Sequence, residues 1–159
     1  MTTILGIDPG YATCGFAIIT KNKDNSQKIL VENFGVIETT PDYSFQERLC
    51  LLGDDFSELL SRYKPDILAI EKLFWGANVD NAIRVAEARG VMEYLAKKSG
   101  LKIVEYAPTE VKSKLVGHGQ APKFQVQNIL KMRLKLSKVP QPDDAADALG
   151  IALICAEEL

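Results

Sequence analysis

Four acidic side chains stand where a small α/β domain could assemble a reactive site. Asp8 ends a short apolar run, Glu71 ends another, and Asp144 and Asp147 lie three residues apart near the C-terminus. The three-residue spacing places Asp144 and Asp147 on one face of a helix. Sites in mixed α/β sheets gather at strand ends and helix termini. We therefore expect the four carboxylates to meet, provided that the strands ending at Asp8 and Glu71 are neighbours.

Carboxylates that are brought together repel one another unless a cation neutralises them or some of them bind protons. Mg²⁺ prefers oxygen ligands, commonly a few carboxylates together with water and a substrate phosphate. Two such ions about 3.5–4 Å apart activate a water and stabilise the leaving oxygen of an in-line displacement. No cysteine or histidine is placed for covalent chemistry. The pattern favours metal-assisted hydrolysis of a phosphodiester.

Each of these acids also has an ordinary structural interpretation. Asp8 precedes Pro-Gly, which is a turn signal, and Glu71 at a strand end would simply be exposed. Asp143, Asp144 and Asp147 would all favour a helix N-terminus, where the macrodipole stabilises negative charge. Both interpretations stay open at this stage, because the three segments converge only if the predicted topology holds.

The apolar pattern predicts the elements that would carry these acids. Leu52, Phe56 and Leu59 recur at helical spacing, whereas the run before Glu71 is almost wholly apolar, as in a central strand. Strands are expected at Thr3–Asp8, Cys14–Thr20, Ile29–Glu38, Asp66–Glu71 and Lys102–Tyr106, and helices at Phe45–Tyr63, Val79–Ser99, Thr109–Leu115, Pro122–Leu136 and Asp143–Glu158. Thr109 is expected to cap its helix. This order predicts an α/β fold with a five-stranded mixed sheet, an antiparallel meander and then alternating helices and strands, flanked by helices.

Length and composition bound the class of protein. The chain has 159 residues, with no repeat and no linker, so residues 1–159 are expected to form a single domain. Asp8 interrupts the first apolar run, so the N-terminus is unlike a secretory signal, and no apolar stretch approaches the ~20 residues of a membrane span. A cytoplasmic location is expected. Cys14, Cys50 and Cys155 are expected to be buried thiols, and the single histidine, His118, argues against structural zinc.

Charge gives a mixed indication of nucleic-acid binding. The net charge is −2 and the isoelectric point about 5.5, whereas DNA-binding domains usually show a basic footprint. Between Glu110 and Val139, however, seven lysines and arginines stand against one acid. This segment would form either one basic surface or ordinary solvated helix faces.

The helix predicted over Val79–Lys98 carries more apolar residues than one buried face requires. These residues are Ile83, Val85, Ala86, Ala88, Val91, Met92, Tyr94 and Leu95. A helix that covers a sheet needs only one apolar stripe. The surplus predicts a second partner, which would be either another helix of the same chain or a second protomer.

Several short motifs, taken in order, resemble one known family, the RuvC crossover junction endodeoxyribonucleases. They run from about Leu5 to Ile154 and so cover nearly the whole chain. Each is weak alone, but their order and spacing are specific. The motifs are Gly6-Ile7-Asp8-Pro9-Gly10 followed by Gly15, Glu71 with Phe74 and Asn78, Ala88-Arg89-Gly90-Val91, and Asp144-Ala145-Ala146-Asp147-Ala148-Leu149.

The resemblance implies an RNase H-like fold and a homodimer that resolves Holliday junctions by cutting two opposed strands of four-way junction DNA in recombination and repair. It implies Asp8, Glu71, Asp144 and Asp147 as catalytic carboxylates and metal ligands, with Mg²⁺ as cofactor, two ions per site, and Mn²⁺ as a substitute. It also implies that two lysines contact phosphates near the scissile bond and that one aromatic residue contacts bases. These three DNA-binding residues are Lys112, Lys123 and Phe74. The implied partners are the RuvA and RuvB branch-migration proteins.

The proposed DNA-binding residues also have ordinary structural interpretations, and three other functions compete with junction resolution. Lys112 and Lys123 would otherwise be surface lysines, and Phe74 and Trp75 a loop folded onto the core. An actin or Hsp70-type ATPase begins similarly but needs two such domains. Another RNase H-like nuclease, of the YqgF group, would not be expected to carry the Asp144 and Asp147 pair with an aromatic loop after Glu71. A DNA-binding module without activity would not need all four acids.

Overall fold

The computed structural model describes residues 1–22, 28–74 and 78–159 and contains one five-stranded sheet. Its strands are β1 (Thr2–Asp8), β2 (Thr13–Lys21), β3 (Ile29–Glu38), β4 (Ile67–Glu71) and β5 (Lys102–Tyr106). They lie in the order β3-β2-β1-β4-β5. The pairs β1–β2 and β2–β3 are antiparallel, whereas β1–β4 and β4–β5 are parallel. This is the predicted mixed sheet, with the two strands that end in acids as neighbours.

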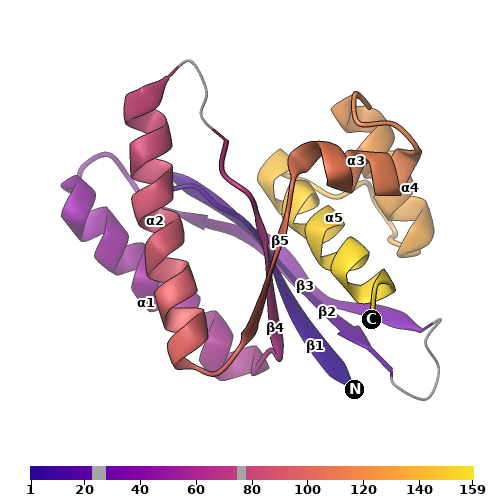
Figure 1. Ribbon diagram of the computed structural model, residues 1–159, viewed down its shortest axis with the longest axis horizontal. Coiled ribbons are helices and arrows are strands. Elements are labelled where there is room, and N and C mark those ends of the chain that lie inside the picture. The colour runs from indigo at the N-terminus through magenta and orange to yellow at the C-terminus, as the bar shows by residue number, and fades with distance from the viewer. Residues whose placement is uncertain (23–27, 75–77) are drawn as a thin grey trace.

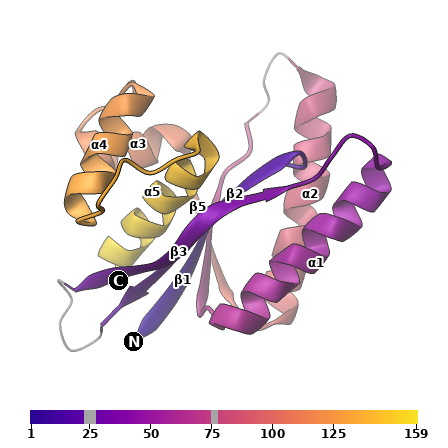
Figure 2. The same ribbon diagram turned by 180° about the vertical axis from the view of Figure 1, so that it is seen from behind.

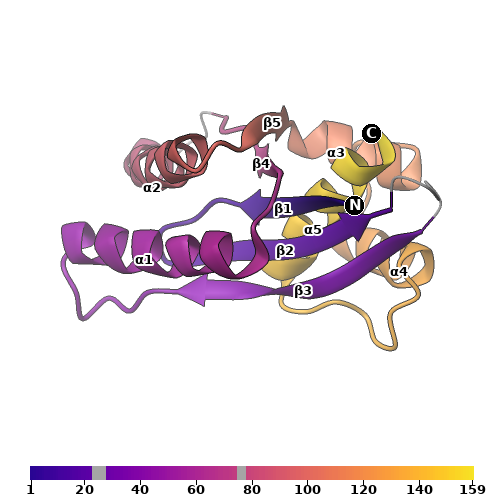
Figure 3. The same ribbon diagram turned by 90° about the horizontal axis from the view of Figure 1, so that it is seen from below.

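Within the described ranges, five helices cover the two faces of the sheet. They are α1 (Phe45–Tyr63), α2 (Val79–Lys98), α3 (Pro108–Val116), α4 (Lys123–Arg133) and α5 (Asp143–Glu157). Helices α1 and α2 lie on one face and α3, α4 and α5 on the other, as the front and back views show (Figures 1 and 2). Figure 3 shows the same division from below, with α1 and α2 on the left and α3 and α4 on the right. No helix within the described ranges is both long and apolar enough to cross a membrane.

Apolar side chains alternate between the two faces of the sheet along each strand, so that a separate hydrophobic core forms on each face. Leu5 and Ile7 pack with α1 and α2, in a cluster that includes Leu52, Phe56 and Met92. The intervening positions of the same strand face α5, and this second cluster is formed by apolar residues of α3, α4 and α5. Since successive side chains of a strand point to opposite faces, Asp8 follows Ile4 and Gly6 onto the α5 side.

Helix α5 lies unusually close to the sheet. Every residue from Ala148 to Ala156 is buried, so the helix is apolar all round rather than along one stripe. Two glycines allow this approach. A Cβ on Gly15 would lie 1.9 Å from the backbone oxygen of Asp144, and one on Gly6 would lie 2.4 Å from that of Ala148. The helix backbone therefore rests directly on β1 and β2.

The structure corrects three local predictions. Thr109 does not cap α3, because the helix begins one residue earlier at Pro108 and Ala107 occupies the cap position. Helix α4 ends at Arg133 rather than Leu136, since Lys135 adopts a left-handed φ of 52°. Cys50 is exposed on α1, whereas Cys14 and Cys155 are buried as expected. Cys50 stands on the outer side of an amphipathic helix, where its apolar neighbours in sequence are no guide to burial.

We expect Gly15→Ala to destabilise the protein by about 1–3 kcal/mol, because the added methyl would collide with helix backbone that cannot rotate away. Thermal unfolding would show this as a melting temperature lower by roughly 3–10 °C. Gly35→Ala is the matched control in the same sheet. There the new Cβ would meet only the tip of the Phe16 ring, at 3.2 Å. Equal stability of the two variants would contradict this account of α5 docking.

Candidate active site

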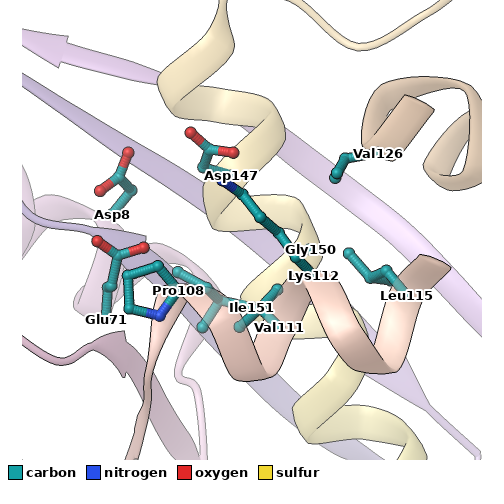
Figure 4. Close-up of a pocket in the computed structure, with 10 residues that line it drawn as sticks. All are labelled: Asp8, Glu71, Pro108, Val111, Lys112, Leu115, Val126, Asp147, Gly150 and Ile151. Atoms are coloured by element: carbon teal, nitrogen blue, oxygen red, sulfur yellow. The ribbon is translucent and has the colours of Figure 1, made fainter. Parts of the chain in front are cut away.

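Two of the predicted acids lie side by side at the carboxyl ends of β1 and β4. These strands pair in parallel, with Ile7 opposite Ile70, so the next residues, Asp8 and Glu71, are neighbours. Both are half-buried, and both line one cavity of about 220 Å³. Figure 4 shows the two carboxylates pointing into this cavity from adjacent strands.

The other two predicted acids come from the first turns of α5. Asp147 lines the same cavity as Asp8 and Glu71, and its carboxylate stands across from theirs (Figure 4). Asp144 does not line the cavity. Its backbone oxygen rests against Gly15, which is itself the strand partner of Asp8. The structure thus brings three acids into one pocket and places the fourth at its edge.

The electrostatics of the acids reflect their burial and mutual repulsion. Burial, followed by the charges of Glu71, Asp147 and Asp144, raises the pKa of Asp8 to about 8. Burial and the charge of Asp147 raise the pKa of Glu71 to about 7. The pKa of Asp147 is also raised, mainly by burial. Such shifts toward neutral pH are typical of functional sites rather than of surface acids.

Two lysines, one from α3 and one from α4, partly offset this repulsion. Lys112 of α3 lines the cavity and extends toward Asp147 (Figure 4), and its charge lowers the pKa of both Glu71 and Asp147. Lys123 begins α4, and its Nζ lies 3.0 Å from Oδ2 of Asp143. The Nε2 of Gln127 donates to Oδ1 of the same Asp143 at 2.9 Å. Asp143 therefore holds Lys123, whose charge lowers the pKa of both Asp8 and Asp147.

Sequence reasoning did not assign this role to Asp143, nor any role to Arg89. The Nε of Arg89 donates to the backbone oxygen of Glu71 at 3.2 Å, while its guanidinium pairs with Glu93 and Glu105. Arg89 thus fixes the end of β4. The Ala88-Arg89-Gly90-Val91 motif pointed to Arg89 in the sequence. It did not predict the contact with Glu71, because that contact forms only when the chain is folded.

The remaining predicted residues lie outside the cavity. Phe74, three residues beyond Glu71, is 61% exposed, so it is not folded onto the core. Trp75 falls outside the described residues. His118 is exposed in the segment between α3 and α4. An exposed aromatic side chain beside an acidic pocket is available to a ligand.

The donor set fits a hard divalent cation better than any softer metal. The cavity offers carboxylate oxygens. Because burial disfavours their charged form, these groups are stabilised either by binding protons or by binding a cation. Within the part of the chain that the structure describes, no three acids, histidines or cysteines are close enough to hold one ion by themselves. This suits ions of the Mg²⁺ type, which take one or two carboxylates and complete their shells with water and substrate phosphate.

The sequence and the fold of this chain both match one family of known proteins. A family model described as "Crossover junction endodeoxyribonuclease RuvC" matches residues 4–155. A RuvC of Thermosipho melanesiensis is 44% identical over 155 residues, which cover 98% of this chain and 97% of the relative. The structure of Thermus thermophilus RuvC matches with a TM-score of 0.85 at 31% identity, over 96% of this chain and 92% of that one.

A structure of the T. thermophilus protein in complex with Holliday junction substrate matches still more completely. Its TM-score is 0.90 at 31% identity, over 99% of this chain and 94% of that one. The five-stranded sheet with flanking helices is thus the fold of the RuvC structures. This confirms the RNase H-like fold that the sequence motifs implied.

The raised pKa values predict an unusual pH dependence for the metal-free protein. An acid whose pKa is higher in the folded state binds extra protons there, so folding stability falls as pH rises between the unfolded and folded values. In EDTA, the melting temperature should fall from about pH 5 to about pH 8. Mg²⁺ should restore it, because a bound cation replaces the lost protons.

Asp8→Asn should flatten this pH dependence, since it removes the acid with the pKa of about 8. Asp42→Asn, at an exposed acid outside the cavity, is the control and should leave the curve as it is in the wild type. A melting temperature in EDTA that rises steadily over the same pH range would show that the acids are not held together as described.

Proposed function

Since this chain belongs to the RuvC family of crossover junction endodeoxyribonucleases, we propose that it resolves Holliday junctions. It is a nuclease that hydrolyses DNA phosphodiester bonds, and its reaction cuts two opposed strands of a four-way junction in recombination and repair. The observation that carries the chemistry is the meeting of Asp8, Glu71 and Asp147 in one cavity. The ATPase alternative loses its support, because the family match spans residues 4–155.

We assign the catalytic roles to Asp8, Glu71, Asp144 and Asp147. Divalent ions bound by these carboxylates would supply Lewis acidity and a water of lowered pKa for attack on phosphorus. Asp8 and Glu71 provide oxygens from the rigid sheet, and Asp147 faces them from α5. We propose that Asp144, at the edge of the pocket and close enough for its charge to act on Asp8, completes the set. The family is divalent-metal-dependent, and we propose Mg²⁺, two ions per site, with Mn²⁺ as a substitute.

Three further residues are proposed to contact DNA. Lys112 reaches the acids from α3 and is half-buried, so its charge lies where a scissile phosphate would approach. Lys123 is held by Asp143, and its charge acts on Asp8 and Asp147. Lysine ammonium groups at such positions attract phosphate oxygens. Phe74, exposed next to Glu71, is proposed to stack on a base at the crossover, an interaction worth about 1–3 kcal/mol.

The active form is proposed to be a symmetric homodimer. One chain carries one carboxylate site, whereas cutting two opposed strands needs two sites related by a two-fold axis. Helix α2 buries Ala82, Ala88, Met92 and Ala96 against its own chain. It still exposes a second stripe at helical spacing. That stripe consists of Val79, Ile83, Ala86, Gly90 and Tyr94.

The same side of α2 borders a hollow of about 680 Å³, which it shares with α1 and which includes Gly53, Val91 and Leu95. The intramolecular alternative therefore accounts for only one of the two apolar faces. We propose the exposed stripe as the interface of the homodimer. We further propose that the protein acts in the cytoplasm on chromosomal DNA, with RuvA and RuvB as its branch-migration partners.

Asp8→Asn is expected to abolish cleavage of a four-way junction while junction binding persists. Loss of a metal ligand should raise the barrier by at least about 4 kcal/mol, or roughly a thousand-fold in rate. Binding should survive because removal of a negative charge eases the approach of phosphates. Nicking in Mg²⁺ of junction, fork and linear duplex DNA measures both the loss and the substrate preference. Near-normal cleavage by this variant would rule out the assigned site.

Ile83→Glu is expected to shift the protein from dimer to monomer, because a buried carboxylate would face the apolar stripe of the second protomer. Sedimentation at micromolar concentration measures the change. Met132→Glu is the control, since Met132 is 69% exposed on α4, on the other face of the sheet. Paired nicking by a protein that sediments as a monomer, with and without junction DNA, would contradict the dimer.

A further inference from the structure

Two arginines and two aromatic rings form a patch beside the proposed active site, which we name the Tyr11 patch. It consists of Tyr11, Phe45, Arg48 and Arg84. Tyr11 lies in the β1–β2 turn, three residues after Asp8, and the other members come from the N-terminal halves of α1 and α2. Figures 1 and 2 show these helix ends at the same end of the sheet as the end of β1.

The rings and guanidiniums of the Tyr11 patch are stacked in a defined geometry. Tyr11 and Phe45 meet edge to face, with centroids 5.5 Å apart. The Arg48 guanidinium lies 4.8 Å from the Tyr11 centroid. That of Arg84 lies 5.8 Å from the Tyr11 centroid and 5.3 Å from the Phe45 centroid. Two positive groups are thus held around one tyrosine ring.

Arg48 has a structural task that accounts for its position. Its Nε donates to Oγ1 of Thr39 at 2.8 Å, and its Nη2 donates to the Thr39 backbone oxygen at 3.2 Å. The Thr39 hydroxyl in turn donates to the backbone oxygen of Tyr11 at 2.5 Å. Arg48 therefore anchors the turn that follows Asp8, and two of its donors are engaged within the chain.

Arg84 has no such task. It is exposed, and its contacts within the described part of the chain are the two rings, without an ion pair to any carboxylate. Arg89 on the same helix and Arg133 on α4 are both paired with glutamates. The Arg48 and Arg84 guanidiniums both lie against the Tyr11 ring, and an anion bound beside them would offset their mutual repulsion. The stacking of Arg84 on the two rings limits its motion, so its fork of donors is pre-oriented.

We propose that the Tyr11 patch binds a backbone phosphate of the DNA through Arg84, a contact that rests on the proposed function. Lys112 and Lys123 belong to α3 and α4, on one side of the carboxylates, whereas Arg84 belongs to α2 on the other. A strand that crosses the site would therefore meet cations on both sides of the cleaved bond. Guanidinium binds phosphate with two parallel hydrogen bonds, which would fix the direction of the strand.

The test is the salt dependence of junction binding in EDTA, where the phosphodiester is not cut. Anisotropy of a labelled four-way junction gives the slope of log affinity against log salt concentration. Arg84→Gln should reduce this slope by about 1, because one phosphate contact is lost. Arg84→Lys should keep the slope. Arg62→Gln is the matched control, since Arg62 is exposed and stacks on Tyr63 at 5.3 Å, at the opposite end of α1.

A lower slope in Arg84→Gln alone, with melting temperature and oligomeric state unchanged, supports the proposal. A slope equal to that of Arg62→Gln, with or without lower stability, would assign Arg84 to packing and overturn it. A linear duplex is measured in parallel. If the wild type shows no preference for the junction, the proposed function fails, and the slope on the duplex still decides whether Arg84 contacts phosphate.

Discussion

The close seating of α5 on the sheet is the contact on which the site depends. Gly6 and Gly15 leave the helix backbone in direct contact with β1 and β2. Any side chain at these positions would lift the N-terminus of α5 away from Asp8 and Glu71. The apolar burial of the remaining helix holds Asp144 and Asp147 near other negative charges. Packing free energy thus opposes the repulsion among acids, which a metal site then relieves.

The distribution of charge explains how a chain with a net charge of −2 is suited to DNA. Asp8, Glu71 and Asp147 are gathered in a half-buried pocket, whereas other acids, such as Asp54, Asp55 and Glu58, are exposed on α1, away from it. Lysines border the pocket on the α3 and α4 side, and Asp143 orients one of them. Net charge averages over these separate regions and is therefore a poor guide to the charge that a phosphate would meet.

Much of this arrangement could be predicted from the sequence, because it follows from periodicity. The strands and helices lie within a few residues of their predicted bounds, and the run before Glu71 indicated a central strand. The alternation of strand side chains and the spacing of Asp144 and Asp147 then predicted that the acids lie on the same side of the sheet. The left-handed residue that ends α4 and the exposure of Cys50 were not predictable, since both depend on tertiary packing.

Contacts between distant segments were beyond prediction for the same reason. The Arg48–Thr39–Tyr11 hydrogen bonds join α1, the end of β3 and a turn, and no short motif encodes them. The partial separation of Asp144 from the pocket also follows from how α5 meets Gly15. Motif order identified which residues matter, but only the folded chain showed what each of them touches.

The central claim is that the carboxylates at the sheet end bind divalent ions. Anomalous scattering from crystals grown with Mn²⁺ and uncleaved junction DNA tests it most directly, because it locates the metal without reference to activity. The account predicts anomalous peaks within coordination distance of Asp8, Glu71 and the α5 acids, about 2.0–2.3 Å from their oxygens. Mn²⁺ bound only elsewhere, in crystals of protein that cleaves the junction in solution, would contradict it.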